Sequence, residues 1–223
     1  MTDNLELWHR YGTTDPRHTK EVSYGRKFTA IDGYYQIMRA TEAFGPCGTG
    51  WGWTSYEEVV VAVDQTGKAH TFAKVKLSLW YHHADQDKRC VAGPVIAMNM
   101  LVSKAGVPDE EAFKKATTDA LTKALSYLGF SADVFMGKFD DVRYVADMKK
   151  KFEKADQEQA AKLPDDAAVA VSSIKAAVSV ASLTNIWNNM KDSYEKLTPA
   201  QQSYVRLQFS MRKQALEAPS ASV

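Results

Sequence analysis

One stretch, Asp109 to Asp133, constrains the fold more than any other part of the sequence. Its apolar residues recur at intervals of three and four, the spacing that lines one face of an α-helix. They are Phe113, Ala116, Ala120, Leu121, Ala124, Leu125 and Leu128. The three acidic residues 109–111 suit the positive amino end of the helix dipole, and Gly129 can adopt the left-handed conformation that ends a helix. The sequence therefore predicts one long helix with a buried face.

The opposite face of this helix carries hydrogen-bond donors. They are Lys114, Lys115, Thr118, Thr122 and Lys123. Ammonium and hydroxyl groups in a row along a helix can follow a phosphate backbone. The same pattern is typical of an ordinary solvated helix face, so both interpretations stay open on this evidence.

Between Trp53 and Met98 the apolar residues alternate, which is the pattern of half-buried β-strands. The runs YEEVVVAV, HTFAKVKLSLWYH and RCVAGPVIAM are separated by the turn sequences DQTGK and ADQDK. Short turns between such runs predict hairpins. The predicted fold class is therefore α+β: an antiparallel three-stranded β-meander packed on the long central helix, in the order β-β-β-α.

Upstream of the meander, the sequence predicts a short strand over residues 28–31 and a helix that Asp32 caps and Gly45 ends. Trp51 and Trp53 lie at the end of a glycine-rich stretch that matches neither a phosphate loop nor a dinucleotide-binding motif. Tryptophans at positions i and i+2 of a strand pack on one face of a sheet more often than they stack on nucleic-acid bases. We therefore expect them to be structural.

The patterns divide the chain into three segments. Residues 1–150 form the core domain, residues 151–181 a charged helix and linker, and residues 182–223 a small C-terminal helical hairpin and tail. Ser182 and Thr198 are the expected N-caps of the two hairpin helices. These helices carry more apolar and aromatic surface than a hairpin can bury alone, which favours docking onto a partner.

Composition limits the class of protein. Of the 223 residues, 45% are hydrophobic and 25% are charged, as in a globular chain that buries a core. No apolar run reaches the ~18 residues of a membrane helix and the start lacks a signal-peptide pattern, so we expect a cytoplasmic protein. The net charge is only +1, so a nucleic-acid site would have to be a local basic groove.

Several motifs in a fixed order resemble a known family. The string GRKFTAIDGYYQIMRATEAFG, then GWGW, the β-meander and FKKATTDALTKALSYLG together resemble the Rad-fifty-two superfamily of single-strand annealing proteins, in particular its compact phage members of the Sak type. The resemblance covers about residues 24–145. It implies a β-β-β-α core, assembly into a ring or helical filament, and single-stranded DNA held in a basic groove. If a phage encodes the chain, the expected compartment is the host cytoplasm.

The resemblance transfers to individual residues only in part. Two adjacent basic residues of the family's helix fall at Thr122 and Lys123, and the family's aromatic residue before the first helix falls at Ala30. An upstream basic residue corresponds to Lys20 or Arg17. The residues that we expect to contact DNA are Lys20, Arg26, Lys27, Lys114, Lys115, Thr122, Lys123, Lys138 and Arg143.

The function implied by the resemblance is annealing of complementary strands in homologous recombination, without ATP, cofactor, metal or bond chemistry. The expected partners are single-stranded DNA, further copies of the chain and, through residues 182–216, a single-strand-binding protein. A passive binder of single strands is one alternative. A metal-dependent nuclease is another, with the acidic residues Asp140, Asp141, Glu57 and Glu58.

Overall fold

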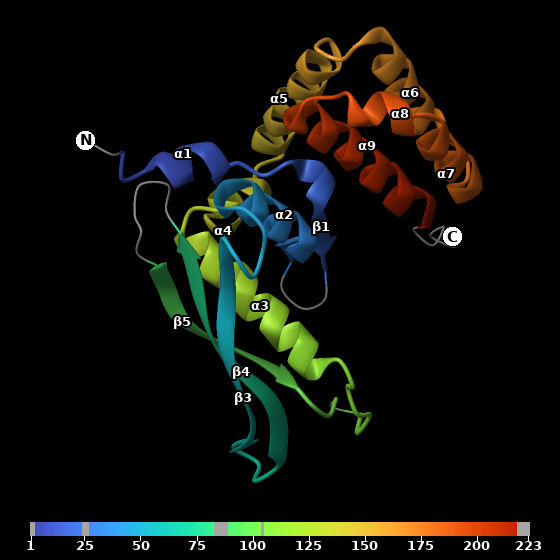
Figure 1. Cartoon of the computed structure of the whole chain (residues 1–223). Coiled ribbons are helices and arrows are strands. Elements are labelled where there is room, and N and C mark those ends of the chain that lie inside the picture. The colour runs from blue at the N-terminus through green and yellow to red at the C-terminus, as the bar shows by residue number, and fades with distance from the viewer. Residues whose placement is uncertain (1–2, 24–26, 83–88, 104, 218–223) are drawn as a thin grey trace. The chain divides into compact units, whose positions relative to one another are not determined.

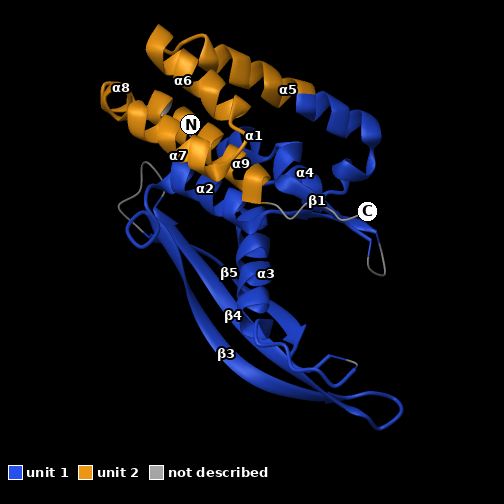
Figure 2. Ribbon diagram, turned by 90° about the vertical axis from the view of Figure 1, so that its right-hand side faces the viewer, with its two compact units in different colours: residues 1–149 blue, residues 150–223 orange. Residues whose placement is uncertain are grey.

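The computed structural model of the 223-residue chain describes residues 3–23, 27–82, 89–103 and 105–217 (Figure 1). The chain divides into two compact units, which Figure 2 colours separately. Unit 1 is Met1–Lys149 and unit 2 is Lys150–Val223. Among the described residues, no helix has the length and apolar character needed to cross a bilayer.

The sheet of unit 1 has three antiparallel strands in the order β3, β4, β5. The strands are β3 (Trp51–Val63), β4 (Ala69–His82) and β5 (Arg89–Met100). The predicted three-stranded antiparallel meander is therefore confirmed. Alternate residues of the central strand, Val75, Leu77 and Leu79, are fully buried, so one face of the sheet lies in the core.

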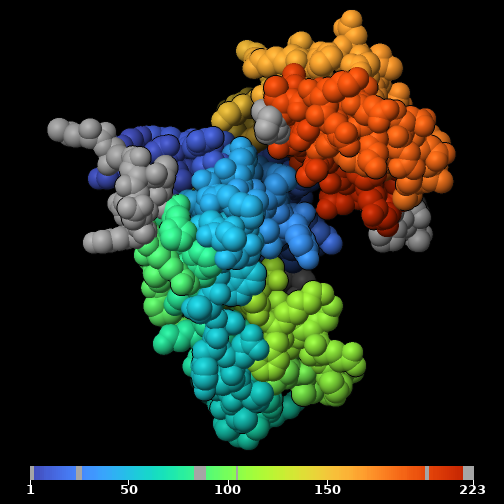
Figure 3. All heavy atoms as spheres, viewed as in Figure 1, coloured from blue at the N-terminus to red at the C-terminus, as the bar shows by residue number. Residues whose placement is uncertain are grey.

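Helix α3 (Ala112–Tyr127) contacts β4 and β5 and supplies the other side of this core. Its buried face is rich in alanine, including Ala116, Ala120 and Ala124, which lets the helix backbone approach the sheet closely. Gly129 has a φ of +97°, as expected of a residue that ends a helix. In Figures 1 and 3 the β3–β4 hairpin extends past the beginning of α3.

The acidic residues 109–111 lie at the amino end of α3 as predicted, but just before the helix and not in its first turn. Asp109 and Glu110 precede the helix, Glu111 is its N-cap residue, and no acidic residue lies in the first turn. The Asp109 carboxylate instead accepts hydrogen bonds from the Glu111 N–H and from Lys115 Nζ, at 3.0 and 2.7 Å. The Asp109 carboxylate thus forms hydrogen bonds within the loop before the helix, and it does not cap the free N–H groups of the first turn.

The amino-terminal part of unit 1 is ordered over its described residues. It contains α1 (Glu6–Tyr11), the 3₁₀ helix η1 (Pro16–His18), β1 (Thr19–Val22), β2 (Phe28–Ile31) and α2 (Gly33–Phe44). β1 and β2 pair as an antiparallel hairpin, with Lys20 opposite Ala30. The Asp32 side chain accepts a hydrogen bond from the Tyr34 N–H at 2.9 Å, so the predicted cap of α2 is confirmed.

Two short elements follow α3 and lead into the last helix of unit 1. They are α4 (Ala132–Phe135) and the 3₁₀ helix η2 (Lys138–Asp140). The helix after them, α5 (Val142–Ala160), continues across the boundary between the two units. Ser131, just before α4, has a φ of 54°, a left-handed conformation that residues other than glycine rarely adopt.

Unit 2 is helical. After α5 it contains α6 (Asp165–Ala176), α7 (Val180–Asn189), α8 (Lys191–Glu195) and α9 (Pro199–Glu217). The predicted linker is wrong over α6, because Ala167, Val171 and Ile174 of that helix are buried in the core of the unit. With α6 present, the C-terminal helices form a packed group in place of an isolated hairpin.

The caps of unit 2 agree with the sequence at one helix and differ at another. Thr198 and Gln201 exchange hydrogen bonds at the start of α9, as predicted. Helix α7 is capped by Ser179, and Ser182 is its capping-box partner, so the predicted cap lies three residues too far along the chain. The helices also bury more apolar surface than predicted, because Leu183, Tyr194 and other side chains pack with α6.

Candidate nucleic-acid interface

The outer side of α3 is bordered by the start of α2. A Cβ atom built on Gly33 would lie 2.9 Å from Cγ2 of Thr118 and 3.8 Å from Cγ2 of Thr122. Only a residue without a side chain lets α2 begin so close to α3. Thr122 is half-buried beside it, and its hydroxyl donates to the Asp119 carbonyl at 3.0 Å. Thr122 is therefore part of the packing between the two helices.

The β1–β2 hairpin borders the other end of this surface, since β2 contacts both α4 and η2. Lys20 is exposed on the hairpin and forms no ion pair with any described residue. Lys27 Nζ pairs with Glu21 at 3.1 Å. Arg17, the alternative to Lys20, is held by the buried carboxylate of Asp15 at 2.6 Å. Arg26 lies outside the described residues.

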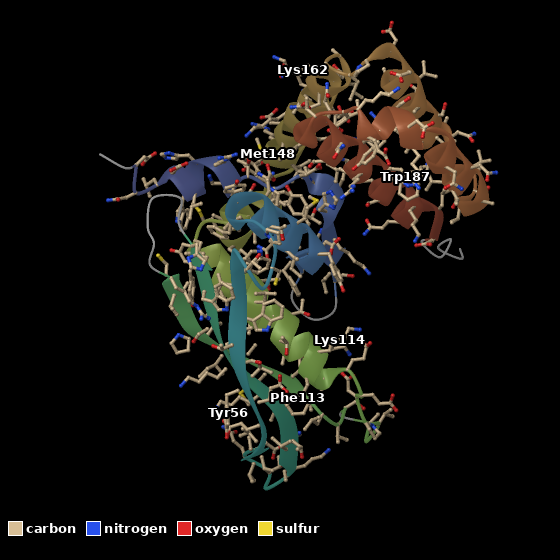
Figure 4. All side chains as sticks on the ribbon, viewed as in Figure 1. Tyr56, Phe113, Lys114, Met148, Lys162 and Trp187 are labelled. Carbon is tan, nitrogen blue, oxygen red and sulfur yellow. The ribbon has the colours of Figure 1, made fainter. Side chains whose placement is uncertain are left out.

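The beginning of α3 is close to neutral. Lys114 pairs with Glu111 at 2.6 Å, and Lys115 pairs with Asp109 at 2.7 Å. The hydrogen bond to Lys114 lowers the pKa of Glu111, and the one to Lys115 lowers the pKa of Asp109. Figure 4 shows Lys114 projecting from α3 away from the sheet. Exposed pairs of this kind contribute little to stability, so an anion can exchange with the carboxylates.

The end of α3 is different, because Lys123 has no carboxylate partner within the described part of the chain. Its ammonium lies 5.5 Å from the ring centroid of Tyr127 and 5.0 Å from that of Phe135. Both rings are about half exposed, at 53% and 43%. A cation held against two exposed rings offers both a charge and flat apolar faces to a ligand.

Lys138 and Arg143 continue the surface beyond α4. Lys138 Nζ lies 5.7 Å from the centroid of the Tyr144 ring, and the Arg143 side chain is exposed. Neither forms an ion pair with the residues that the structure describes. Among the described members of the predicted set, the cations without an ion pair are therefore Lys20, Lys123, Lys138 and Arg143.

A buried carboxylate fixes the position of α4. Asp133 is 2% exposed and accepts hydrogen bonds from the N–H and hydroxyl of Thr14 at 2.8 and 2.6 Å. It also accepts from the Tyr144 hydroxyl at 2.9 Å and from the Val134 N–H at 2.9 Å. Burial, with help from this hydrogen bond, raises the pKa of Tyr144, which keeps the donor protonated. The amino-terminal segment, α4 and α5 thus meet at one residue.

Sequence reasoning missed the aromatic residues of this surface. Tyr34 is 79% exposed, and Phe28 is 49% exposed on the hairpin strand β2. Tyr127 could have been found, because it follows Lys123 by four residues and so shares its helix face. Phe135 could not, because its place depends on the left-handed turn at Ser131. Of the two tryptophans predicted to be structural, Trp51 is fully buried as expected, whereas Trp53 is 36% exposed.

The acidic residues of the nuclease alternative do not converge. Glu57 and Glu58 are neighbours on β3 and therefore point to opposite faces, and Glu58 pairs with Lys74 at 2.7 Å. Asp141 accepts a hydrogen bond from the Arg143 N–H. In the described ranges, no three His, Cys, Asp or Glu residues are grouped so that they could hold a metal ion.

No described residue of unit 1 covers the face of the sheet opposite α3, as the exposed side chains on that face show. Tyr56, Lys76 and Ile96 lie side by side across the three strands on this face. Tyr56 is 63% exposed and Ile96 is 55% exposed, and Met98 and Val91 are also exposed there. Figure 4 shows Tyr56 projecting from β3 on the side away from α3. An apolar surface of this kind on a folded unit is typical of an interaction site.

The chain matches no protein-family model and no curated protein.

Proposed function

We propose that the chain binds single-stranded DNA along the surface formed by the β1–β2 hairpin, α4, η2 and the end of α3, and that it anneals complementary strands. The observation that carries the proposal is Lys123, a cation without a carboxylate partner in the described chain, whose ammonium lies 5.5 and 5.0 Å from the ring centroids of Tyr127 and Phe135. Lys20, Lys138 and Arg143 extend the charge on elements that contact one another or follow directly in the chain.

The mechanism is electrostatic and needs no bond chemistry. Complementary strands repel each other through their phosphates and fold on themselves. Lysine and arginine contacts neutralise part of the backbone charge and release counterions, while bases held in an extended strand stay available for pairing. A groove repeated in every subunit of an assembly would hold a long strand through a few contacts per subunit.

A second copy of the chain is the proposed occupant of the uncovered sheet face. Tyr56, Ile96 and Met98 provide apolar area, and β3 and β5 are open edge strands in unit 1. A ring or a helical filament is built from contacts that join two different patches of neighbouring copies. We therefore propose that the β-β-β-α unit assembles through its sheet and leaves the outer side of α3 to the DNA.

Neutralising the cations tests the DNA-binding surface. The double variant Lys123→Gln, Lys138→Gln should bind an oligothymidylate more weakly. Its plot of log affinity against log salt should be shallower by about 1.4, since each phosphate contact on a single strand contributes about 0.7. The matched control Lys175→Gln, Lys191→Gln changes the net charge equally and should keep the slope of the unmodified chain. Equal slopes for both double variants would refute the assignment.

The helices of unit 2 keep their proposed role as the docking site of a single-strand-binding protein. The support is the separate compactness of the unit, which lets it act independently of unit 1. Removal of residues 165–223 should leave binding to naked strands intact and abolish activity on strands coated with that protein. Full activity of the shortened chain on coated strands would refute the role.

A further inference from the structure

This inference rests on the proposed function and concerns how the bases of the strand are held. We infer that Tyr127 and Phe135 form a stacking platform for an unpaired nucleobase, with Lys123 contacting the phosphate of the same or the adjacent nucleotide. The ligand class is thus a nucleotide whose base has a free face. This goes beyond charge neutralisation, because it makes the surface selective for single strands.

The geometry offers a contact to both parts of a nucleotide, namely aromatic rings for the base and an ammonium group for the phosphate. The Lys123 ammonium is about equally far from the two ring centroids, at 5.5 and 5.0 Å, and the rings come from different elements, α3 and α4. Tyr127 and Phe135 are 53% and 43% exposed, so part of each side chain is open to a ligand. The next residue, Met136, is 61% exposed and enlarges the apolar surface.

The charge of Lys123 favours a nucleotide over an apolar ligand. A lysine stem often covers apolar side chains while its ammonium bonds to a carboxylate or reaches water. Here the ammonium lies close to the two rings and has no acidic partner among the described residues. A bound anion would supply the ion pair that it lacks. A nucleotide carries both a phosphate anion and a flat base in the same molecule.

Stacking on a platform also suits annealing. It uses the face of the base and leaves its hydrogen-bonding edge open to a complementary strand, and it is tolerant of sequence because every base has a π-face. In a duplex both faces of each base are already covered by neighbouring bases. The platform should therefore release a strand once it has paired.

The test compares a base-bearing strand with an abasic one. Full-length protein is titrated into a fluorescent oligothymidylate and into an abasic phosphodiester strand of equal length, and binding is followed by anisotropy. The unmodified chain should bind the oligothymidylate about tenfold more tightly than the abasic strand. In Tyr127→Leu, Phe135→Leu this preference should disappear while affinity for the abasic strand is kept. Lys123→Met should lower the affinity for both strands by a similar factor.

Two further results complete the test. Tyr127→Phe keeps the ring and should keep the preference for bases, which separates loss of stacking from damage to the fold. Equal affinity of the unmodified chain for both strands, or a preference that survives loss of both rings, overturns the platform and leaves the DNA-binding proposal standing. Failure of the unmodified chain to bind either strand overturns the proposed function and the platform with it.

Discussion

Asp133 is the residue on which the geometry of the interface depends most. It is buried and accepts four hydrogen bonds, from Thr14 twice, from Val134 and from Tyr144. These bonds tie the amino-terminal segment to α4, which carries Phe135. A carboxylate without those donors would be an uncompensated buried charge. The position of the ring beside Lys123 therefore depends on a residue that would not itself contact DNA.

Asp133→Ala should lower the free energy of unfolding by about 3 kcal/mol, because it leaves several buried donors without an acceptor. Urea denaturation followed by tryptophan fluorescence measures the change. Asp147→Ala, on the exposed side of α5, is the control and should change stability by less than about 0.5 kcal/mol. A loss of under about 1 kcal/mol for Asp133→Ala would contradict the account.

His18 makes the stability of unit 1 depend on pH. Its ring stacks on Tyr35 with centroids 4.4 Å apart, and burial lowers its pKa from the usual 6.5, although Asp15 and Asp32 act in the opposite direction and Arg17 adds to the lowering. The folded state thus favours the neutral ring. The stabilisation is present above pH 6.5 and is lost as the pH falls through the lowered pKa of the folded state.

The expected result is a decrease in the free energy of unfolding as the pH falls below 6.5, and a smaller decrease in His18→Asn. Denaturant titrations at a series of pH values measure both. Identical pH profiles for His18→Asn and the unmodified chain would show that another group is responsible.

At the scale of single residues, the sequence correctly predicted the features that depend only on a residue's own chemistry and its immediate neighbours. Asp32 as a cap and Gly129 as a helix end follow from side-chain chemistry and backbone freedom. The proximity of Phe135 to Lys123 does not, because Ser131 adopts a left-handed conformation that its residue type does not signal. Thr122 was predicted to contact DNA, and this stays a prediction; the structure adds that the residue is half-buried and close to Gly33 of α2.

At the scale of elements, the period of the apolar residues was a reliable guide to the sheet and to α3. It was less informative for α6, where alanine and serine dilute the apolar pattern and the sequence suggested a linker. Ala167 and Val171 are buried in a core to which α7, α8 and α9 contribute by packing against that helix. Tertiary contacts in unit 2 thus stabilise α6 as a helix although its local sequence pattern is weak.

The uncovered face of the sheet is tested by placing a charge on it. Ile96→Glu should convert the proposed assembly to monomers, or weaken the proposed association at least tenfold, because a desolvated carboxylate would face an apolar contact. Light scattering coupled to size-exclusion chromatography measures the mass. Val178→Glu makes the same change at an 83% exposed residue of unit 2 and should leave the mass unchanged. Equal masses for Ile96→Glu and the unmodified chain would contradict the proposed contact.

At the scale of the whole molecule, the two compact units divide the proposed work. Unit 1 holds the cationic and aromatic surface and the uncovered sheet, whereas unit 2 buries its own helical core. The net charge of +1 is compatible with the proposed DNA binding, because the charges are unevenly distributed. The lysines at the start of α3 are neutralised by ion pairs with Glu111 and Asp109, whereas Lys123 and Lys138 form no ion pair with a described residue. The proposed DNA-binding surface is therefore located by the local pairing of charges, which only the fold reveals.

The rate at which complementary strands pair tests the central claim most directly. Two complementary oligonucleotides, one with a fluorophore and one with a quencher, are mixed with and without the full-length chain at low and high salt. The account predicts faster pairing with the protein at low salt, loss of the acceleration at high salt, and no acceleration by Lys123→Gln, Lys138→Gln. Strands that are bound by the protein but pair no faster, or more slowly, than in buffer would contradict it.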